Sequence, residues 1–302
     1  MTRFLLVAVL VIACGKDKER GEPTPAAPED DRCQPLPFAD AAPVPEASGA
    51  GWMTLDGKPA LLVISDSGNG GAYAIVDAET GESRETGRLP LGTAGEDLEG
   101  LSARGELLYA ITSSGWILGY RRKAGGFDLA KGPYPLGPLD LPDKGGMGDK
   151  PPEGTGMVCG QRATNCGRNY EGLCLVDAAH EKGPCIGFAA SKADGHLYCV
   201  VEQEGGKLAV TYEPRIAITK PGALADCAFD DAGQLYVGSN LFDMAQVSRV
   251  DGWDNPATAK VTKIAPLGIG FPETLAARGD VIYRMSDTGG APSLMNKFRC
   301  RR

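Results

Sequence analysis

Short apolar runs alternate with glycine- and serine-containing turns along most of this chain of 302 residues. Between Leu98 and Arg122, one apolar run ends near Thr112 and a second occupies residues 117–120, and each is only four to six residues long. Runs of that length between turn residues predict β-strands and not helices. The same order recurs in three further stretches, which begin at Gly51, Leu224 and Phe271. We therefore predict an all-β fold.

A recurring pair of positions indicates that the strands form repeats. An acidic residue precedes a tyrosine by ten positions in three copies and by more in a fourth, across an insertion: Glu99 with Tyr109, Asp226 with Tyr236, Glu273 with Tyr283, and Glu171 with Tyr198. A fifth, degenerate copy has Trp52 and Leu62 at the two positions. Such self-similarity predicts a β-propeller. We expect five four-stranded blades, or six if residues 137–169 contain an irregular one.

Closure of the ring depends on the two ends of the domain. The last repeat contains only three strand-sized runs before Arg302, and the piece 33–38 ahead of the first blade could supply the fourth strand. Because blades bury their faces only against neighbours, a closed ring is the stable arrangement. In a ring closed in this way Cys33 and Cys300 would lie close together, and a disulfide between them would lock the ring.

The amino-terminal segment predicts export and a lipid anchor. Ten apolar residues, 4–13, follow a short basic start and are too few to span a bilayer. The ending VIAC resembles the lipobox of bacterial lipoproteins, which implies cleavage before Cys14 and lipidation of that cysteine. We expect a signal peptide at 1–13, a lipidated tether at 14–48 that includes the closing strand, and a propeller domain at 49–302. The alternative is an ordinary secretory peptide that happens to end in cysteine.

The residues after Cys14 indicate where the protein is displayed. Seven prolines and many charged residues between positions 15 and 45 predict an extended tether. Gly15 stands where an inner-membrane retention signal would place aspartate, which favours the outer membrane in a Gram-negative source. We therefore expect a bacterial cell-envelope protein whose membrane partner is reached through its lipid. Whether the ring faces the periplasm or the cell surface is left open.

The net charge indicates which classes of partner the protein can bind, and the cysteine count indicates disulfide formation. Without Arg3 the chain carries 30 basic and 39 acidic residues, a net charge of about −9, which disfavours nucleic acid and favours cationic ligands. Nine cysteines leave eight after lipidation of Cys14, enough for four disulfides in an oxidising compartment. Cys159 and Cys166 are the easiest local pair. A zinc site is the alternative, but CxxC pairs are absent and histidine occurs only twice.

The repeated acidic position is the candidate functional feature. Propeller symmetry would bring its four members to one mouth of the central channel: Glu99, Glu171, Asp226 and Glu273. Like charges held together cannot all stay ionised without compensation, and a hard cation such as Ca²⁺ would provide it. The alternative is that each carboxylate caps backbone N–H groups of the neighbouring blade.

Glycine and leucine follow the acidic residue in two copies, DLEGL at 97–101 and NYEGL at 169–173. Together with the turn ISDSGNGG from Ile64, these motifs resemble the phytase-like (esterase-like activity of phytase) and SdiA-regulated β-propeller families. The resemblance implies a propeller, calcium in or near the channel and, in some relatives, phosphoester hydrolysis. Glu99 and Glu171 are the matching positions, whereas Asp226 and Glu273 lack the following glycine.

Few enzyme signatures are present. The GxSxG, HExxH and GxxxxGK patterns are all missing from the sequence. We therefore expect a binding module for a protein, peptide or envelope component. The alternative function is a metal-dependent phosphoester hydrolase with the four carboxylates as calcium ligands, and a purely structural envelope module comes third.

Overall fold

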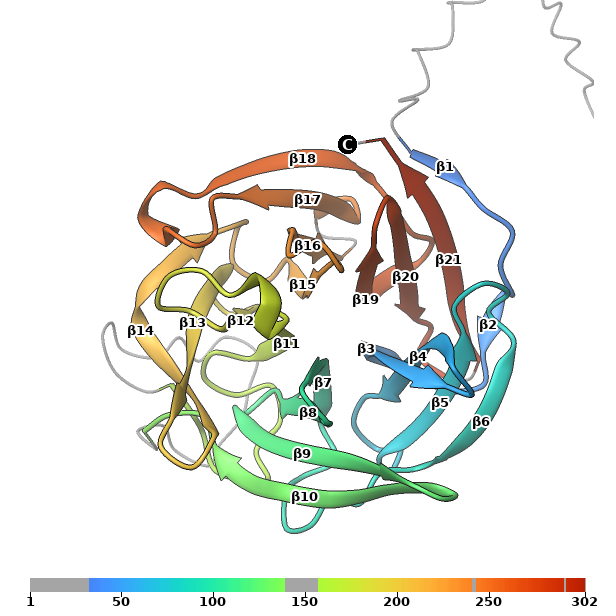
Figure 1. Ribbon diagram of the computed structural model, residues 1–302, viewed down its shortest axis with the longest axis horizontal. Helices are drawn as coiled ribbons and strands as arrows, with labels where there is room; N and C mark the ends of the chain where they lie inside the picture. Colours follow the sequence, from blue (N-terminus) through green and yellow to red (C-terminus); the bar gives the residue numbers. More distant parts are fainter. Residues whose placement is uncertain (1–32, 139–156, 241–242, 291, 302) are drawn as a thin grey trace, which may run out of the picture. The chain divides into compact units, whose positions relative to one another are not determined.

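Five antiparallel sheets are arranged as blades around one axis in the computed structural model (Figure 1). The structure describes residues 33–138, 157–240, 243–290 and 292–301. Each blade has four main strands, so the prediction of five four-stranded blades is confirmed, and the described residues contain no sixth sheet. The predicted signal peptide, Cys14 and the tether up to residue 32 lie outside the described residues.

The strands follow one another from the inside of each blade to its outside. The first two blades contain β3 (Ala47–Leu55), β4 (Lys58–Ser65), β5 (Ala72–Asp77) and β6 (Ser83–Arg88), then β7 (Leu98–Arg104), β8 (Leu107–Thr112), β9 (Trp116–Lys123) and β10 (Gly126–Pro135). The third blade contains β11 (Tyr170–Leu175), β12 (Gly187–Ser191), β13 (His196–Gln203) and β14 (Lys207–Ala217). The fourth contains β15 (Leu224–Phe229), β16 (Leu235–Ser239), β17 (Gln246–Asp251) and β18 (Lys260–Pro266). The short 3-10 helices η1 (Ala178–His180) and η3 (Pro256–Thr258) lie in connections.

The fifth blade joins both ends of the domain. It contains β19 (Phe271–Arg278), β20 (Val281–Asp287) and β21 (Ser293–Cys300), and its outer strand is β1 (Cys33–Pro35), which pairs antiparallel with β21. The short β2 (Ala41–Ala42) pairs with the other end of β21. Cys33 lies opposite Cys300, and a disulfide connects them. The predicted closing strand and its disulfide are therefore confirmed.

The apolar core is divided among the five interfaces between neighbouring blades. Each of these interfaces has its own cluster of buried side chains, and β8 is buried at all six positions because it lies deep between two neighbours. The outer strand β6 instead alternates between exposed and half-buried positions. Continuous apolar runs therefore belong to inner strands, and alternating patterns to outer ones.

Glycines near the start of the innermost strands have a packing role. An ideal Cβ on Gly100 would lie 2.2 Å from the backbone nitrogen of Leu173, and one on Gly49 would lie 2.6 Å from the carbonyl oxygen of Glu99. The innermost strands of the first three blades, β3, β7 and β11, thus approach each other backbone to backbone. Glycine is needed there because no side chain fits.

The third blade corrects one pairing expected from the sequence. Tyr198 lies in β13, the third strand, and not in the second strand as the tyrosines of the other repeats do. Phe188 on β12 faces Cys174, just as Tyr109 on β8 faces Ser102. The interpretation of Tyr198 as a displaced repeat position was wrong, because the second strand of this blade carries phenylalanine where the others carry tyrosine.

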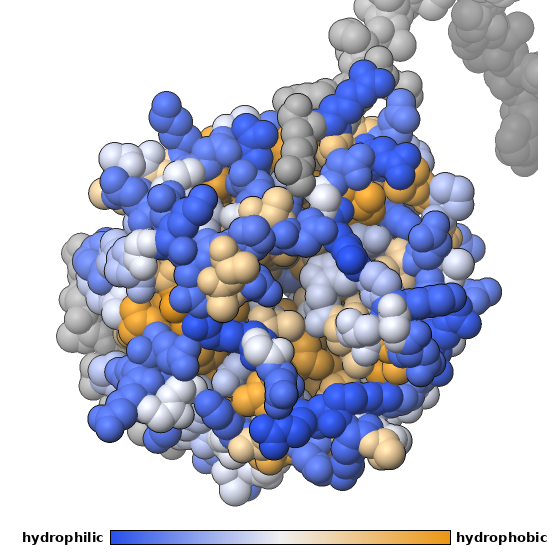
Figure 2. Space-filling model, in the orientation of Figure 1, coloured by the Kyte–Doolittle hydropathy of each residue, from blue (hydrophilic) through white to orange (hydrophobic). Residues whose placement is uncertain are grey.

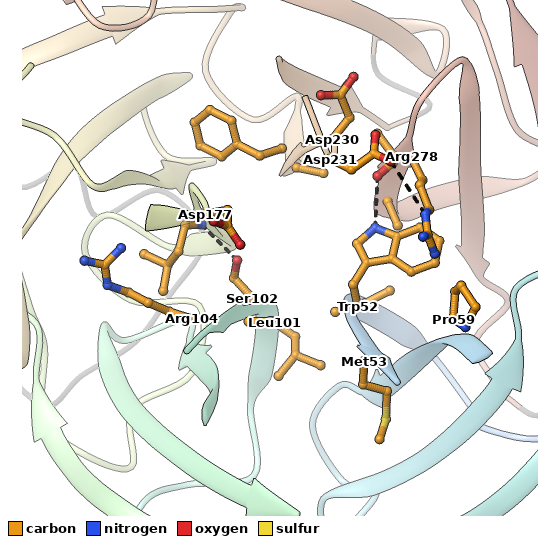
Figure 3. A pocket seen from close by; sticks show the side chains of 18 of the residues that line it. Trp52, Met53, Pro59, Leu101, Ser102, Arg104, Asp177, Asp230, Asp231 and Arg278 are labelled. Carbon is orange, nitrogen blue, oxygen red and sulfur yellow. Dashed lines mark hydrogen bonds and ion pairs between the residues drawn. The ribbon is translucent and has the colours of Figure 1, made fainter. Parts of the chain in front are cut away.

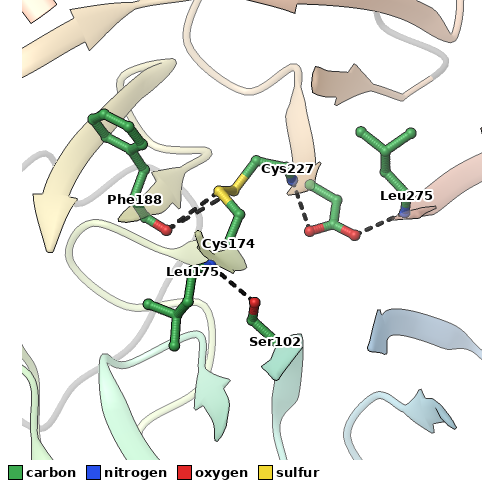
Figure 4. Close-up of a disulfide and its surroundings, with 7 residues drawn as sticks. Ser102, Cys174, Leu175, Phe188, Cys227 and Leu275 are labelled. Carbon is green, nitrogen blue, oxygen red and sulfur yellow. Dashed lines mark hydrogen bonds between the residues drawn. A yellow bond between two sulfur atoms is a disulfide. The ribbon is translucent and has the colours of Figure 1, made fainter. Parts of the chain in front are cut away.

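Four disulfides are present among the described residues. The predicted Cys159–Cys166 pair is one of them, and Cys185–Cys199 lies within the third blade. Cys174–Cys227 connects β11 to β15 and therefore crosses from the third blade to the fourth (Figure 4). Together with Cys33–Cys300, it ties the ring at two separate places.

An ion pair between the first two blades predicts a pH dependence of stability. Arg122 donates to Glu85 through Nη1 at 2.7 Å and Nη2 at 2.5 Å, and these bonds lower the pKa of Glu85 to about 2. A lowered pKa gives stability that is present above pH ~4.3 and is lost as the pH falls through 2. Both side chains are partly exposed, so we expect Glu85→Gln to cost about 1 kcal/mol at pH 7 and almost nothing at pH 2. Urea unfolding at both pH values, with the exposed Glu82→Gln as the control, would measure this; an equal loss at both pH values would contradict it.

Candidate functional site

Three glutamates occupy one structural position on three innermost strands. In β7 the pairing with β8 skips from Leu98 to Gly100, and the bulged residue is Glu99. Glu171 in β11 and Glu273 in β19 are bulged in the same way. A bulge leaves its extra residue out of the ladder and redirects its side chain. All three lie near the amino-terminal ends of their strands, at one mouth of the ring, and all are buried.

Asp226 does not share this position. The bulged residue of β15 is Ala225, and Asp226 pairs with Gly238 at the level of Gly100 in β7. Its two carboxylate oxygens accept hydrogen bonds from the backbone nitrogens of Cys227 and Leu275, each at 2.7 Å. Asp226 therefore caps the backbone of the neighbouring blade, which is the alternative that the sequence left open for this residue.

The degenerate fifth copy is also displaced. Ser48, and not Trp52, is the bulged residue of β3. The Ser48 hydroxyl donates to the carbonyl oxygen of Leu98 at 2.5 Å and so connects the first blade to the second. Trp52 lies further along β3, toward the opposite mouth of the ring.

Lys192 occupies one side of the acidic mouth. It lies in the turn after β12, and its ammonium group donates to Glu171 Oε2 at 2.8 Å and to Glu273 Oε1 at 3.3 Å. Burial lowers the pKa of Lys192, but the charges of Glu171 and Glu273 outweigh it and raise this pKa above its usual range. This lysine therefore stays protonated and neutralises part of the mouth.

Asp66 and Asp97 add two carboxylates on the side of Glu99. One oxygen from each of Asp66, Asp97 and Glu99 lies within 4.8 Å of the others. Asp97 accepts a hydrogen bond from the Ser113 hydroxyl, and burial and the Asp66 charge raise the pKa of Asp97 to about 7. Burial, followed by the charge of Glu171, raises the pKa of Glu99 well above its usual value. The group consists of oxygen donors, which are the ligands that hard cations prefer.

Sequence reasoning missed Asp66, Asp97 and Lys192 as members of this mouth. Asp66 stood inside the turn SDSGNGG, which the sequence favoured as an inter-strand turn over a calcium-binding loop of its own, and Asp97 stood at the start of DLEGL without a role. The signal that could have found Asp97 is its place two residues before the bulge. Lys192 carries no such signal, because it reaches the channel from a turn between β12 and β13.

The opposite end of the innermost strands surrounds a central funnel of about 680 Å³. Leu101, Leu173, Cys227 and Ala276 are among its lining residues nearest the acidic mouth and form an apolar floor. Charged residues, among them Arg104, Asp177, Asp230 and Arg278, lie around its rim (Figure 3). The space-filling view shows a hollow near the centre of the ring with apolar residues between largely hydrophilic surroundings (Figure 2). The volume is within the range of small-ligand sites.

Trp52 forms part of the funnel wall. Its indole nitrogen donates to the carbonyl oxygen of Ala277 at 2.9 Å, and the Arg278 guanidinium lies 5.4 Å from its ring centroid (Figure 3). Arg278 also contacts Asp231 at 3.7 Å. The indole is thus held at a fixed orientation beside the cavity.

Acidic residues outnumber basic ones at the rim. Arg104 is bound by Glu181 at 2.6 Å and by Glu202 at 2.8 Å, so its charge is already compensated. Asp177, Asp230 and Asp231 line the funnel, against the two arginines Arg104 and Arg278. The rim therefore favours a ligand with a cationic group.

Solved structures of other proteins resemble this chain at low identity. Glutaminyl cyclase of Myxococcus xanthus is 12% identical over 89% of this chain and 97% of that chain, with a TM-score of 0.49. A candidate 6-phosphogluconolactonase of Bacteroides uniformis is 15% identical over 83% and 80%, with a TM-score of 0.47. BamB of Moraxella catarrhalis is 16% identical over 87% of this chain and 62% of that chain, with a TM-score of 0.36. These likenesses assign no activity to the chain.

No family model and no curated protein matches the sequence. The chain is a five-bladed β-propeller, and its resemblance to the phytase-like and SdiA-regulated families stays an expectation. No helix in the described part of the chain is long and apolar enough to cross a membrane.

Proposed function

We propose that this protein is a binding module of the bacterial cell envelope, anchored through Cys14, whose central funnel takes an apolar side chain of a peptide or protein with a basic group beside it. The observation that carries the proposal is the funnel itself, a cavity of about 680 Å³ at the centre of a closed ring. Its apolar floor would accept a buried aliphatic or aromatic group. Its acidic rim would accept the cation.

The construction of the funnel supports binding without rearrangement. Its walls are innermost strands from all five blades, and the Cys174–Cys227 disulfide fixes two of those strands at the floor. Such a preorganised site loses little conformational entropy when a ligand enters. The overall negative charge of the chain acts in the same direction as the rim by attracting cationic partners.

Tryptophan fluorescence would test the proposal. The probe is a short blocked peptide that contains leucine and lysine, and its matched partner carries glutamate in place of lysine. We expect the lysine peptide to shift the Trp52 emission saturably and the glutamate peptide to bind at least ten-fold more weakly. Trp52→Phe identifies the signal, because Trp116 and Trp253 do not line the funnel.

A matched pair of variants places opposite charges in the funnel. Met53 lines the cavity, and Met53→Lys should abolish binding of the lysine peptide, whereas Met53→Glu, of similar length, should retain it. Thermal unfolding of both variants checks that the ring is intact. Equal binding by the two variants, or no saturable signal from either peptide, would remove the support for a funnel site.

The phosphoesterase alternative rests on the acidic mouth, which holds Glu99, Glu171 and Glu273 at the other end of the innermost strands. Incubation of the same protein with an aryl phosphate and Ca²⁺ would reveal phosphoester hydrolysis. Turnover that disappears in Glu99→Gln would favour hydrolysis over binding as the main activity.

A further inference from the structure

We propose that a second cavity, between the third and fourth blades, binds a vicinal diol, which is the chemistry of a short polyol or of a sugar unit. This cavity has a volume of about 160 Å³ and shares no lining residue with the central funnel. Strands of the fourth blade line it on one side, and Ile218 and Thr219, which follow β14 of the third blade, line it on the other. At about 30 Å³ for each molecule of liquid water, its volume equals about five water molecules, so the ligand must be small.

The lining side chains of the fourth blade share one face of its sheet. Ser248 in β17 lies opposite Val237 in β16 and Lys263 in β18, so these three residues form a row across the sheet. Ser239 and Gln246 lie two positions further along their strands and therefore point to the same side. This face is turned toward the third blade, because Val237 belongs to the buried cluster that the two blades share.

Ser248 supplies a buried hydroxyl that the protein leaves without a partner. Its side chain is only 6% exposed and lines the cavity, and within the described residues it forms no hydrogen bond. Nearly all buried polar groups in native structures are bonded to protein, water or a ligand. A serine hydroxyl both donates and accepts, so it can bind a hydroxyl of a ligand in either direction.

Asp243 and Gln246 add acceptor oxygens to the same cavity. Asp243 Oδ2 accepts from the Thr219 hydroxyl at 3.1 Å, and its Oδ1 has no partner among the residues that the structure describes. Gln246 donates through Nε2 to the carbonyl oxygen of Val247 at 2.5 Å, which leaves its own Oε1 to accept. Adjacent hydroxyls of a diol each donate one hydrogen, so two acceptor oxygens beside the Ser248 hydroxyl match them.

The charges around the cavity favour a ligand without net charge. Asp243 disfavours an anion, and Lys263 on the same lining disfavours a cation. Lys263 is exposed at the edge, whereas the buried polar group is the Ser248 hydroxyl. A zwitterionic amino acid would have to place its carboxylate at that edge, whereas a diol uses the groups inside. Leu224 and Val261 would contact the carbon atoms of the ligand.

Saturation-transfer NMR on the full chain would test the site with erythritol and methyl glucoside as probes. Butane-1,4-diol is the matched control for erythritol, because it has the same carbon chain without adjacent hydroxyls. For ligands of this size we expect saturable binding of one or both diol probes with a millimolar Kd, and binding of butane-1,4-diol and alanine at least about ten-fold weaker. Binding of erythritol alone would identify a short polyol, and binding of methyl glucoside would identify a sugar unit.

Matched variants locate the ligand. Ser248→Ala removes the unpartnered hydroxyl, and Asp243→Asn replaces an acceptor oxygen by an amide that donates, so each should weaken diol binding at least about five-fold. Thr262→Ala is the control, because Thr262 is exposed on the opposite face of β18 and should not affect binding. Thermal unfolding of each variant checks that the ring is intact.

Four results would overturn the proposal. They are equal binding of erythritol and butane-1,4-diol, binding by Ser248→Ala and Asp243→Asn that equals that of the unmodified chain, and stronger binding of alanine than of either diol. The fourth is the absence of a saturable signal from both diol probes, which would show that the cavity takes up water only. The Trp52 assay of the funnel reports separately on the proposed function.

Discussion

Replacement of both Cys33 and Cys300 by serine is expected to lower the free energy of unfolding by about 5 kcal/mol, the largest loss that we anticipate for a conservative change. The disulfide spans 267 residues and fastens β1 to β21, so it restricts nearly the whole unfolded domain. Without it, the three-residue β1 holds the fifth blade by backbone hydrogen bonds alone. Urea unfolding of the oxidised chain and of the double variant would measure the difference.

The Cys159–Cys166 pair provides the control for this experiment. It spans only seven residues, and its removal should cost about 2 kcal/mol by the same loop-entropy argument. If the two double variants lose similar free energies of unfolding, the Cys33–Cys300 disulfide contributes less to stability than we predict.

Replacement of Gly100 by alanine is expected to cost about 3 kcal/mol or more, because the added methyl group would meet backbone and not a flexible side chain. An ideal Cβ there lies 2.2 Å from the nitrogen of Leu173 and 2.6 Å from the carbonyl carbon of Gly172. The innermost strands β7 and β11 would have to separate, and the ring would loosen at the channel. Thermal and urea unfolding would show the loss.

Gly290→Ala is the matched control for Gly100→Ala. Nothing lies within 4 Å of an ideal Cβ at Gly290, and neither glycine has the positive backbone angle that disfavours alanine. We expect a change within about 0.5 kcal/mol there. A Gly100→Ala variant as stable as this control would mean that the blades can move apart without penalty, against the packing described above.

The two ends of the channel have different chemistry. One is an apolar-floored funnel with an acidic rim, and the other is a buried acidic mouth that a lysine compensates on one side. In our proposal the funnel engages the partner.

Much of the fold could be predicted because it depends on local pattern. Strand-sized runs between turns predicted the blades, and the missing last strand together with the cysteine positions predicted that residues near Cys33 close the ring against Cys300. Tyr198 was assigned to the wrong repeat position because the third blade carries Phe188 where the other repeats carry the tyrosine of the acidic–tyrosine pair.

The candidate site could be predicted only in part. Glu99 and Glu273 precede their tyrosines by ten residues and share a bulge, yet Asp226, with the same spacing, does not. The turn between β15 and β16 is longer than that between β7 and β8, so equal spacing hides a shift of one residue. On a strand, a shift of one residue turns the side chain to the other face, and Asp226 points between blades as a result.

The sequence by itself determined the all-β class, the repeat and the residues that close the ring, because these follow from alternation, turn chemistry and cysteine position along the chain. The tertiary structure alone decided which carboxylates meet. Asp66, Asp97 and Lys192 reach the mouth from loops and strand ends in three blades, and the funnel takes its wall from all five. Such sites depend on the distance between segments far apart in sequence, which only the closure of the ring fixes.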